Sequence, residues 1–225
     1  MSWDVLVVGG GVVGWSVAHH LALAGAGRIL VVDRGGGSTE RATGGFRAQF
    51  ATEVNVRLSL LSRQKLLAFR EETGVDPGFL PAGYLFLAGT EAQRERLAAA
   101  SEVQRAAGCD EAAPVDLEEI RRLAPWIRPL GVVGGAFSPR DGFVRPMEIR
   151  RGYVESALRA GVQRLEEEVV GLERMHGALR VRTSTGAHEA AVVVNAAGPW
   201  AGRLGALAGV EVPVQPLRRQ VAVTV

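Results

Sequence analysis

Cysteine and lysine are nearly absent from this sequence. Its one cysteine, Cys109, cannot form a disulfide within the chain, and this fits a reducing compartment. Lys65 is the only lysine among 26 basic residues, so catalysis by a lysine of this chain would have to use it. The low numbers of cysteine and lysine exclude an internal disulfide and leave a single candidate for lysine catalysis.

The sequence also lacks a strong net charge and long apolar runs. Its 26 basic and 24 acidic residues leave a formal net charge of +2, too balanced to indicate a nucleic-acid partner. No uninterrupted apolar run approaches the ~20 residues that cross a bilayer. The start, Met1–Asp4, has no basic segment of the kind that opens a signal peptide. We expect a cytoplasmic protein without a membrane span.

What the sequence does have is a glycine motif directly after its first apolar stretch. Three glycines at G-x-G-x-x-G spacing follow that stretch: Gly9, Gly11 and Gly14. An acidic residue, Asp33, comes nineteen positions after the last glycine, at the end of a second apolar run over 29–32. A strand before the glycines, a helix after them and an acid at the next strand's end are the context that favours dinucleotide binding.

Each part of this motif has a physical role in holding a dinucleotide. Gly9 permits the tight turn, Gly11 lets a pyrophosphate approach the backbone, and Gly14 lets the helix pack close to the strand. The helix that begins near Val12 offers free N–H groups and a positive dipole end to phosphates. Asp33 would accept hydrogen bonds from ribose hydroxyls. The alternative is a glycine-rich turn that binds nothing.

Apolar periodicity predicts a mixed α/β chain, and its 225 residues allow one large or two small domains. Helices are expected over 12–24, 52–72, 91–107, 116–123, 146–158 and 200–209. Strands are expected over 3–8, 29–32, 84–88, 162–165, 169–175, 179–183, 189–194 and 218–225. Two short segments, 136–138 and 142–144, bracket Pro139–Asp141 as a hairpin or a strand bend.

Two segments do not fit this regular pattern. The stretch 34–50 is a long loop rich in glycine, hydroxyls and arginine, and loops of that length are usually functional or disordered. The expected strand over 218–225 reaches the last residue, and we expect the chain to be cut inside a domain rather than to end on an edge strand.

Four segments together resemble the FAD-dependent D-amino-acid oxidase superfamily, in particular its sarcosine oxidase, dimethylglycine dehydrogenase and glycine oxidase branch. They are the glycine motif with Asp33, the loop over 38–50, the segment Asp141–Pro146 and the segment Val192–Trp200. They occur in the family's order over nearly the entire chain. Because members usually run well beyond 225 residues, the chain resembles the amino-terminal part only.

The resemblance implies an α/β fold. A Rossmann-like FAD-binding domain, with a parallel sheet and a β-meander, would carry an inserted and partly present α+β substrate domain. The first part of the FAD-binding domain would span 1–82 and its second part 143–211. The substrate domain would begin over 83–142, and its second part would start at 212–225.

The resemblance also implies non-covalent FAD, because Cys109 matches no flavin-attachment position. It assigns cofactor contacts along the fingerprint, the loop and the later strands. These are Gly9, Gly11, Val12, Val13, Gly14, Asp33, Arg34, Ser38, Thr39, Thr43, Gly44, Gly45, Phe46, Val169, Ala196, Ala197, Gly198 and Trp200.

The activity implied is oxidation of the C–N bond of a small amine or amino acid, of the sarcosine, dimethylglycine, glycine or D-amino-acid type. Hydride would pass to flavin N5, and oxygen or a redox partner would accept the electrons. Arg47 and Gln49, at the end of the loop, are candidates to meet the flavin or a substrate carboxylate, since an arginine fork suits a carboxylate. The alternative for Arg47 is a surface or packing role.

Other readings stay open from the sequence. A nicotinamide-dependent dehydrogenase would explain the fingerprint, although not the loop or Val192–Trp200. A catalytically incomplete FAD-binding piece, or one half of an enzyme completed by another chain or a second copy, would explain the length. Metal binding is not expected, because the adjacent His19 and His20 point about 100° apart on a helix.

Overall fold

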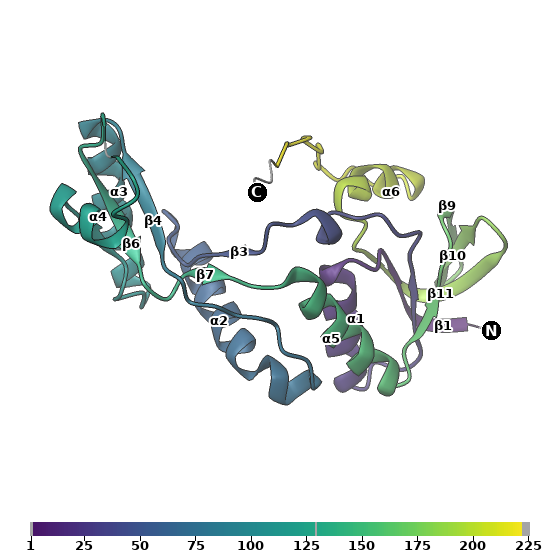
Figure 1. Cartoon of the computed structure of the whole chain (residues 1–225). Helices are drawn as coiled ribbons and strands as arrows, with labels where there is room; N and C mark the ends of the chain where they lie inside the picture. Colours follow the sequence, from purple (N-terminus) through teal and green to yellow (C-terminus); the bar gives the residue numbers. More distant parts are fainter. Residues whose placement is uncertain (1, 129, 222–225) are drawn as a thin grey trace. The chain divides into compact units, whose positions relative to one another are not determined.

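The chain forms two compact units. The computed structural model describes residues 2–128 and 130–221 (Figure 1). Unit 1 is assembled from Met1–Ala42, Thr73–Val75 and Pro146–Val225, and unit 2 from Thr43–Glu72 and Asp76–Arg145. Residues 43–72, 76–82 and 143–145, which the sequence prediction assigned to the FAD-binding domain, fall in unit 2.

Unit 1 is built on a six-stranded sheet in the order β8-β2-β1-β11-β10-β9. Its strands are β1 (Ser2–Val8), β2 (Ile29–Val32), β8 (Gln163–Leu165), β9 (Val169–Met175), β10 (Ala178–Thr183) and β11 (Ala187–Asn195). The four strands β8, β2, β1 and β11 run parallel to one another, whereas β10 pairs antiparallel with both β11 and β9. The sheet is thus the parallel sheet with a β-meander that the resemblance implies.

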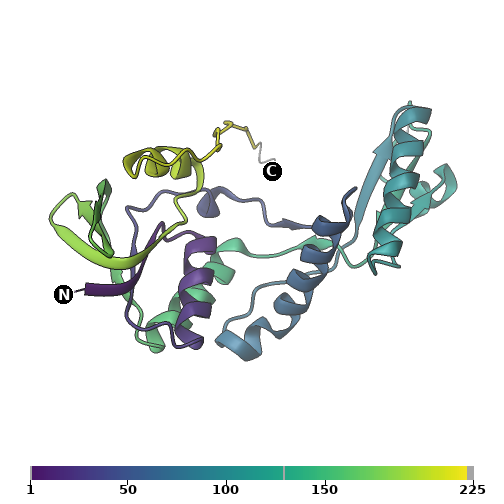
Figure 2. The same cartoon turned by 180° about the vertical axis from the view of Figure 1, so that it is seen from behind.

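Helices α1 (Val12–Leu23) and α5 (Pro146–Arg159) pack against each other on one face of this sheet. They lie side by side in both views (Figures 1 and 2). Trp15 of α1 is 1% exposed, and burying a side chain of that kind contributes about 1.5–3 kcal/mol. Alternate strand residues such as Val5 and Val7 face these helices. Leu6 and Val8 pack on the other face, with Leu204 of α6 (Ala201–Leu207).

The described residues of unit 2 form two small sheets and three helices. A three-stranded antiparallel sheet has the order β4-β6-β5, and β3 pairs with β7. The strands are β3 (Gly45–Phe46), β4 (Tyr84–Ala88), β5 (Ala113–Val115), β6 (Gly134–Ser138) and β7 (Gly142–Phe143). The helices are α2 (Glu53–Thr73), α3 (Glu91–Ala106) and α4 (Leu117–Leu123). Asp116 caps α4 as predicted, since its Oδ1 accepts a hydrogen bond from the Glu119 N–H at 2.8 Å.

Three sequence predictions need correction. Of the two alternatives for the segments around Pro139–Asp141, the hairpin is wrong, because β6 pairs with β4 and β5 while β7 pairs with β3, and the chain turns between the two strands. Of the strand expected over 218–225, residues 218–221 form no strand, and 222–225 lie outside the described residues. The sequence prediction also missed β5 and the two-residue strand β3, which lies in the expected loop over 34–50. The remaining predicted elements form with ends shifted by at most two residues.

Candidate functional site: a dinucleotide cavity in unit 1

A cavity of about 670 Å³ opens at the carboxyl ends of the parallel strands of unit 1. It is bounded by the end of β1, the end of β2, the end of β11 and the start of α1. This is the place where open parallel sheets bind ligands. Thirteen of the predicted cofactor residues line it: Gly9, Gly11, Val12, Val13, Asp33, Arg34, Ser38, Thr39, Val169, Ala196, Ala197, Gly198 and Trp200.

The glycine loop leaves no room for side chains at its two ends. Gly9 has φ +111°, and a Cβ there would lie 2.3 Å from the carbonyl oxygen of Ala196. A Cβ on Gly14 would lie 1.8 Å from the Gly9 carbonyl oxygen, so Gly14 sits under the loop rather than in the cavity. A Cβ on Gly11, which lines the cavity, would lie 3.2 Å from Thr39 Oγ1, closer than an ordinary contact. The loop therefore packs tightly against the protein at Gly9 and Gly14, and Gly11 leaves its backbone uncovered at the cavity.

The amino end of α1 points its backbone donors at this cavity. Its N-cap residue is Gly11, which has no side chain to satisfy the first N–H groups. Thr39, from the short 3-10 helix η1 (Thr39–Arg41), partly replaces a cap, because its Oγ1 accepts a hydrogen bond from the Val12 N–H at 3.0 Å. A helix amino end with open N–H groups favours phosphate.

The opposite side of the cavity carries an arginine stacked on a tryptophan. The Arg34 guanidinium lies 4.6 Å from the centre of the Trp200 ring and donates a 2.7 Å hydrogen bond to Glu168. Because both charged side chains are more than a third exposed, the ion pair contributes little to stability. Its effect is to fix the Arg34 guanidinium over the Trp200 ring at the cavity wall.

Sequence reasoning missed several residues that line the cavity. They are Val8, Val32, Gly35, Gly37, Ala42, Glu167, Glu168, Val170, Asn195, Pro199, Ala201, Arg203, Leu204 and Leu207. Val170, Asn195 and Pro199 are direct sequence neighbours of predicted cofactor contacts, and they could have been predicted on that ground. Glu167 and Glu168 carried no signal in the sequence, because they lie before β9 in an ordinary acidic stretch.

The other predicted site residues belong to unit 2. Thr43, Gly44, Gly45 and Phe46 lie at and before β3, and Gly44 accepts the N–H of Val144 at 2.8 Å. Whether they touch FAD stays a prediction.

Arg47 and Gln49 are held by their own unit. The Arg47 guanidinium lies over three aromatic rings, with centroid distances of 4.8 Å to Phe50, 5.4 Å to Phe86 and 5.8 Å to Tyr84. Gln49 is buried and donates a 2.8 Å hydrogen bond to the Tyr84 carbonyl oxygen. Arg47 thus makes the contacts of the packing alternative, and the catalytic role of both residues stays a prediction.

Asp141 anchors the backbone between these two residues. Its carboxylate is fully buried, and Oδ1 accepts a 2.9 Å hydrogen bond from the N–H of the buried Ala48. Burial raises the pKa of Asp141 above its usual value, and the N–H of Ala48 and the Gln49 amide oppose the rise.

We expect Asp141→Leu to lower the free energy of unfolding by about 1–3 kcal/mol, because it leaves the Ala48 N–H buried without an acceptor. Asp141→Asn keeps an acceptor and is the matched control. Because the pKa of Asp141 is raised in the folded protein, its carboxyl contributes most to the free energy of unfolding below its pKa in the unfolded chain. This contribution is lost as the pH rises through the folded-state pKa. Urea unfolding across that window should show this loss in wild type and not in Asp141→Asn. Equal slopes would contradict the assignment.

Three other features of the described residues bear on the site. Residues 2–128 and 130–221 contain no group of three His, Cys, Asp or Glu side chains able to hold a metal. None of the helices that these residues form has both the length and the apolar character that crossing a bilayer requires. Cys109 is buried in unit 2, where desolvation raises the pKa of its thiol to about 11 and keeps it protonated at neutral pH.

The cavity fits a dinucleotide carrying a pyrophosphate. A backbone loop that excludes side chains, a helix amino end and a carboxylate at the next strand end meet around it. Fold and site together define a dinucleotide-binding protein of the Rossmann type. The chain matches the family described as "FAD dependent oxidoreductase" over residues 4–225, and it belongs to that family. Its cofactor is therefore FAD, and the nicotinamide-dependent alternative has no support.

The relatives confirm the resemblance drawn from the sequence. FAD-dependent oxidoreductase domain-containing protein 1 of Xenopus laevis is 30% identical over 98% of this chain and 53% of its own length. Human mitochondrial dimethylglycine dehydrogenase is 29% identical over 98% of this chain and 26% of its own length. The chain thus spans about half of the first relative and about a quarter of the second.

Solved structures agree with the fold. L-proline dehydrogenase from P. horikoshii superposes with a TM-score of 0.85 at 30% identity, over 92% of this chain and 56% of the other. Glycine oxidase from Geobacillus kaustophilus superposes with a TM-score of 0.82 at 29% identity, over 92% and 58%. In both comparisons the chain corresponds to little more than half of its relative.

Proposed function

We propose that this chain forms the FAD-holding part of an enzyme that oxidises the C–N bond of a small amine or amino acid. The observation that carries the proposal is the cavity of unit 1, with its glycine loop and Asp33, in a chain of the FAD-dependent oxidoreductase family. Relatives are named for dimethylglycine, sarcosine, glycine and L-proline, all of which have a carbon bearing hydrogen next to an amine nitrogen.

The residues of the cavity would bind and orient the cofactor. Gly11 would offer its backbone N–H to the pyrophosphate, whereas the Val12 N–H is already bonded to Thr39, and Asp33 would offer a carboxylate to the ribose hydroxyls. Arg34 and Trp200 would cover the adenosine end. When bound, FAD supplies a two-electron acceptor for the hydride next to the nitrogen, whereas the protein supplies binding and orientation.

The chain's length favours a second proposal: this piece binds FAD but needs further chain to oxidise a substrate. The supporting observation is that it spans about half of relatives such as the Xenopus protein and glycine oxidase. The rest of the substrate site would then come from a continuation of the same chain, from a complementing chain or from a second copy.

Anaerobic flavin reduction separates the two proposals. The 225-residue chain is loaded with FAD and mixed in turn with sarcosine, dimethylglycine, glycine, L-proline and D-alanine. Loss of the oxidised-flavin absorbance with one of these supports an enzyme complete in this chain. A chain that binds FAD and is reduced by none of them supports the incomplete piece. A hydroxy compound without nitrogen is added as a further probe, and reduction by it and by none of the amines would overturn C–N oxidation.

The electron acceptor is tested on the same sample. After reduction, air and an artificial dye are supplied separately. Rapid reoxidation by air indicates an oxidase, whereas reoxidation by the dye alone indicates a dehydrogenase that uses a redox partner.

A further inference from the structure

An arginine of α5 donates a hydrogen bond to the backbone of the glycine loop, Gly9–Gly11. Arg150 Nε donates a 2.7 Å hydrogen bond to the carbonyl oxygen of Gly10, although the two residues are 140 positions apart. We propose that Arg150 is the positioning residue that aims the N–H of Gly11 at the pyrophosphate of FAD. The proposal rests on FAD as the cofactor and adds a residue that the fingerprint does not contain.

The direction of this bond matters because of peptide geometry. In a trans peptide, the carbonyl of one residue and the N–H of the next lie in one plane and point in opposite directions. The Gly10 carbonyl and the Gly11 N–H share such a peptide. When Arg150 holds the carbonyl toward α5, the N–H is turned the other way, and Gly11 is one of the residues that line the cavity.

The loop needs an external restraint because it contains three successive glycines, Gly9–Gly11. Glycine has the widest conformational freedom of any residue, so these peptides would rotate easily without a further restraint. The guanidinium side chain is about one fifth exposed, and a charged donor makes a stronger hydrogen bond than a neutral one. Arg150 therefore fixes an orientation that the glycines alone leave free.

Two other roles for Arg150 fit the structure less well. Its side chain stands outside the set of described residues that line the cavity, which does not favour a direct contact with phosphate. Its NH2 group lies 4.0 Å from Asp33 Oδ2, which is too long for a hydrogen bond, whereas the Gly10 bond is short. Asp33 also packs on Gly10, since a Cβ there would lie 2.8 Å from Asp33 Oδ2.

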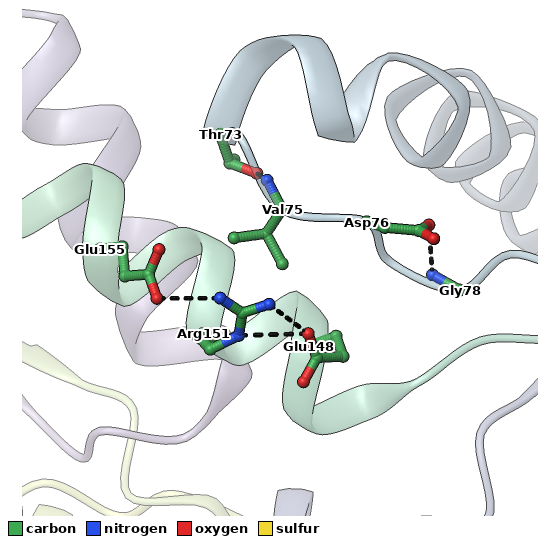
Figure 3. Close-up of polar contacts among 7 residues, drawn as sticks. All are labelled: Thr73, Val75, Asp76, Gly78, Glu148, Arg151 and Glu155. Atoms are coloured by element: carbon green, nitrogen blue, oxygen red, sulfur yellow. Dashed lines mark hydrogen bonds and ion pairs between the residues drawn. The ribbon is translucent and has the colours of Figure 1, made fainter.

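The neighbouring Arg151 provides a matched control on the same helix. Its guanidinium bonds to Glu148 at 2.5 Å and to Glu155 at 3.1 Å, both within α5 (Figure 3). Arg151→Met therefore removes an arginine of the same helix without touching the glycine loop. Arg150→Met removes the donor, and Arg150→Lys restores a single donor of different shape.

The first measurement is calorimetric titration of the 225-residue chain with FAD, ADP and adenosine. We expect Arg150→Met to raise the Kd of FAD and ADP about tenfold, the change that corresponds to losing one good hydrogen bond. The Kd of adenosine, which has no phosphate, should stay unchanged. Arg150→Lys should recover part of the loss, and Arg151→Met should match wild type. Equal weakening of adenosine would overturn the proposal, because Arg150 would then act on the ribose end.

The second measurement needs no cofactor. Backbone 15N relaxation of the free chain should show rigid Gly10 and Gly11 amides in wild type and Arg151→Met, and fast motion in Arg150→Met. If Arg150→Met fails to fold, Arg150→Lys is compared with wild type instead. Unchanged amide motion would overturn the proposal even if FAD binds. Failure of wild type to bind FAD or ADP would refute the cofactor role of this chain and leave the relaxation result to decide on Arg150.

Discussion

Gly14→Ala is expected to abolish FAD binding by this chain. The new Cβ would lie 1.8 Å from the Gly9 carbonyl oxygen and 3.0 Å from the Gly9 carbonyl carbon. Both are backbone atoms of the turn between β1 and α1, so the helix has to move away from the strand. Overpacking of this kind costs about 1–3 kcal/mol even where side chains can adjust. The measurement is FAD titration followed by flavin absorbance, together with thermal unfolding of the free chain.

Gly186→Ala is the matched control for this substitution. A Cβ at Gly186 would meet no atom within 4 Å, and the residue lies in the turn between β10 and β11, away from the cavity. The control should bind FAD like wild type and unfold at nearly the same temperature. Normal FAD binding by Gly14→Ala would show that the tight contact between α1 and β1 is not needed.

Asp33→Asn is expected to weaken FAD binding about tenfold to hundredfold, since hydrogen bonds to a charged group contribute about 1.5–3 kcal/mol. Asparagine has nearly the same shape and keeps the packing against Gly10. The substitution therefore removes the charge that would receive the ribose hydroxyls and little else. Isothermal titration with FAD measures the change.

Glu166→Gln supplies the comparison for Asp33→Asn. Glu166 is exposed, pairs with Arg164 at 3.3 Å and stands apart from the described cavity lining. The Glu166→Gln variant should bind FAD with the same affinity as wild type. If Asp33→Asn binds FAD as tightly as this control, Asp33 is not the ribose ligand and the acid of the fingerprint has another role.

The sequence predicted the α/β architecture well because most of its elements carry strong local signals. The run Val5–Val8 into three glycines determines a strand, a turn and a helix without help from distant residues. The strand β5 was missed because Pro114 argues against a strand interior. The structure tolerates it, since β5 lies at the edge of the order β4-β6-β5 and Pro114 needs no partner on its open side.

Pairing between strands was harder to predict than the strands themselves. The two segments around Pro139–Asp141 are neighbours in sequence, which favours a hairpin, but β7 finds its partner in β3. Likewise, the sequence did not predict Arg150 as a site residue. Its hydrogen bond to Gly10 arises only when α5 packs against α1, and no spacing rule links positions 10 and 150.

The parallel pairing of β1 with β11 sets an order of events during synthesis. Val5 is aligned with Val192 and Val8 with Asn195, so the central strands of unit 1 come from opposite ends of the sequence. Contacts between such distant residues form late and slowly, because a long loop must close first. The ribosome would have to synthesise the chain through β11 before the cavity exists. Until then the glycine motif would emerge as an unpaired apolar strand, exposed to chaperones or to aggregation.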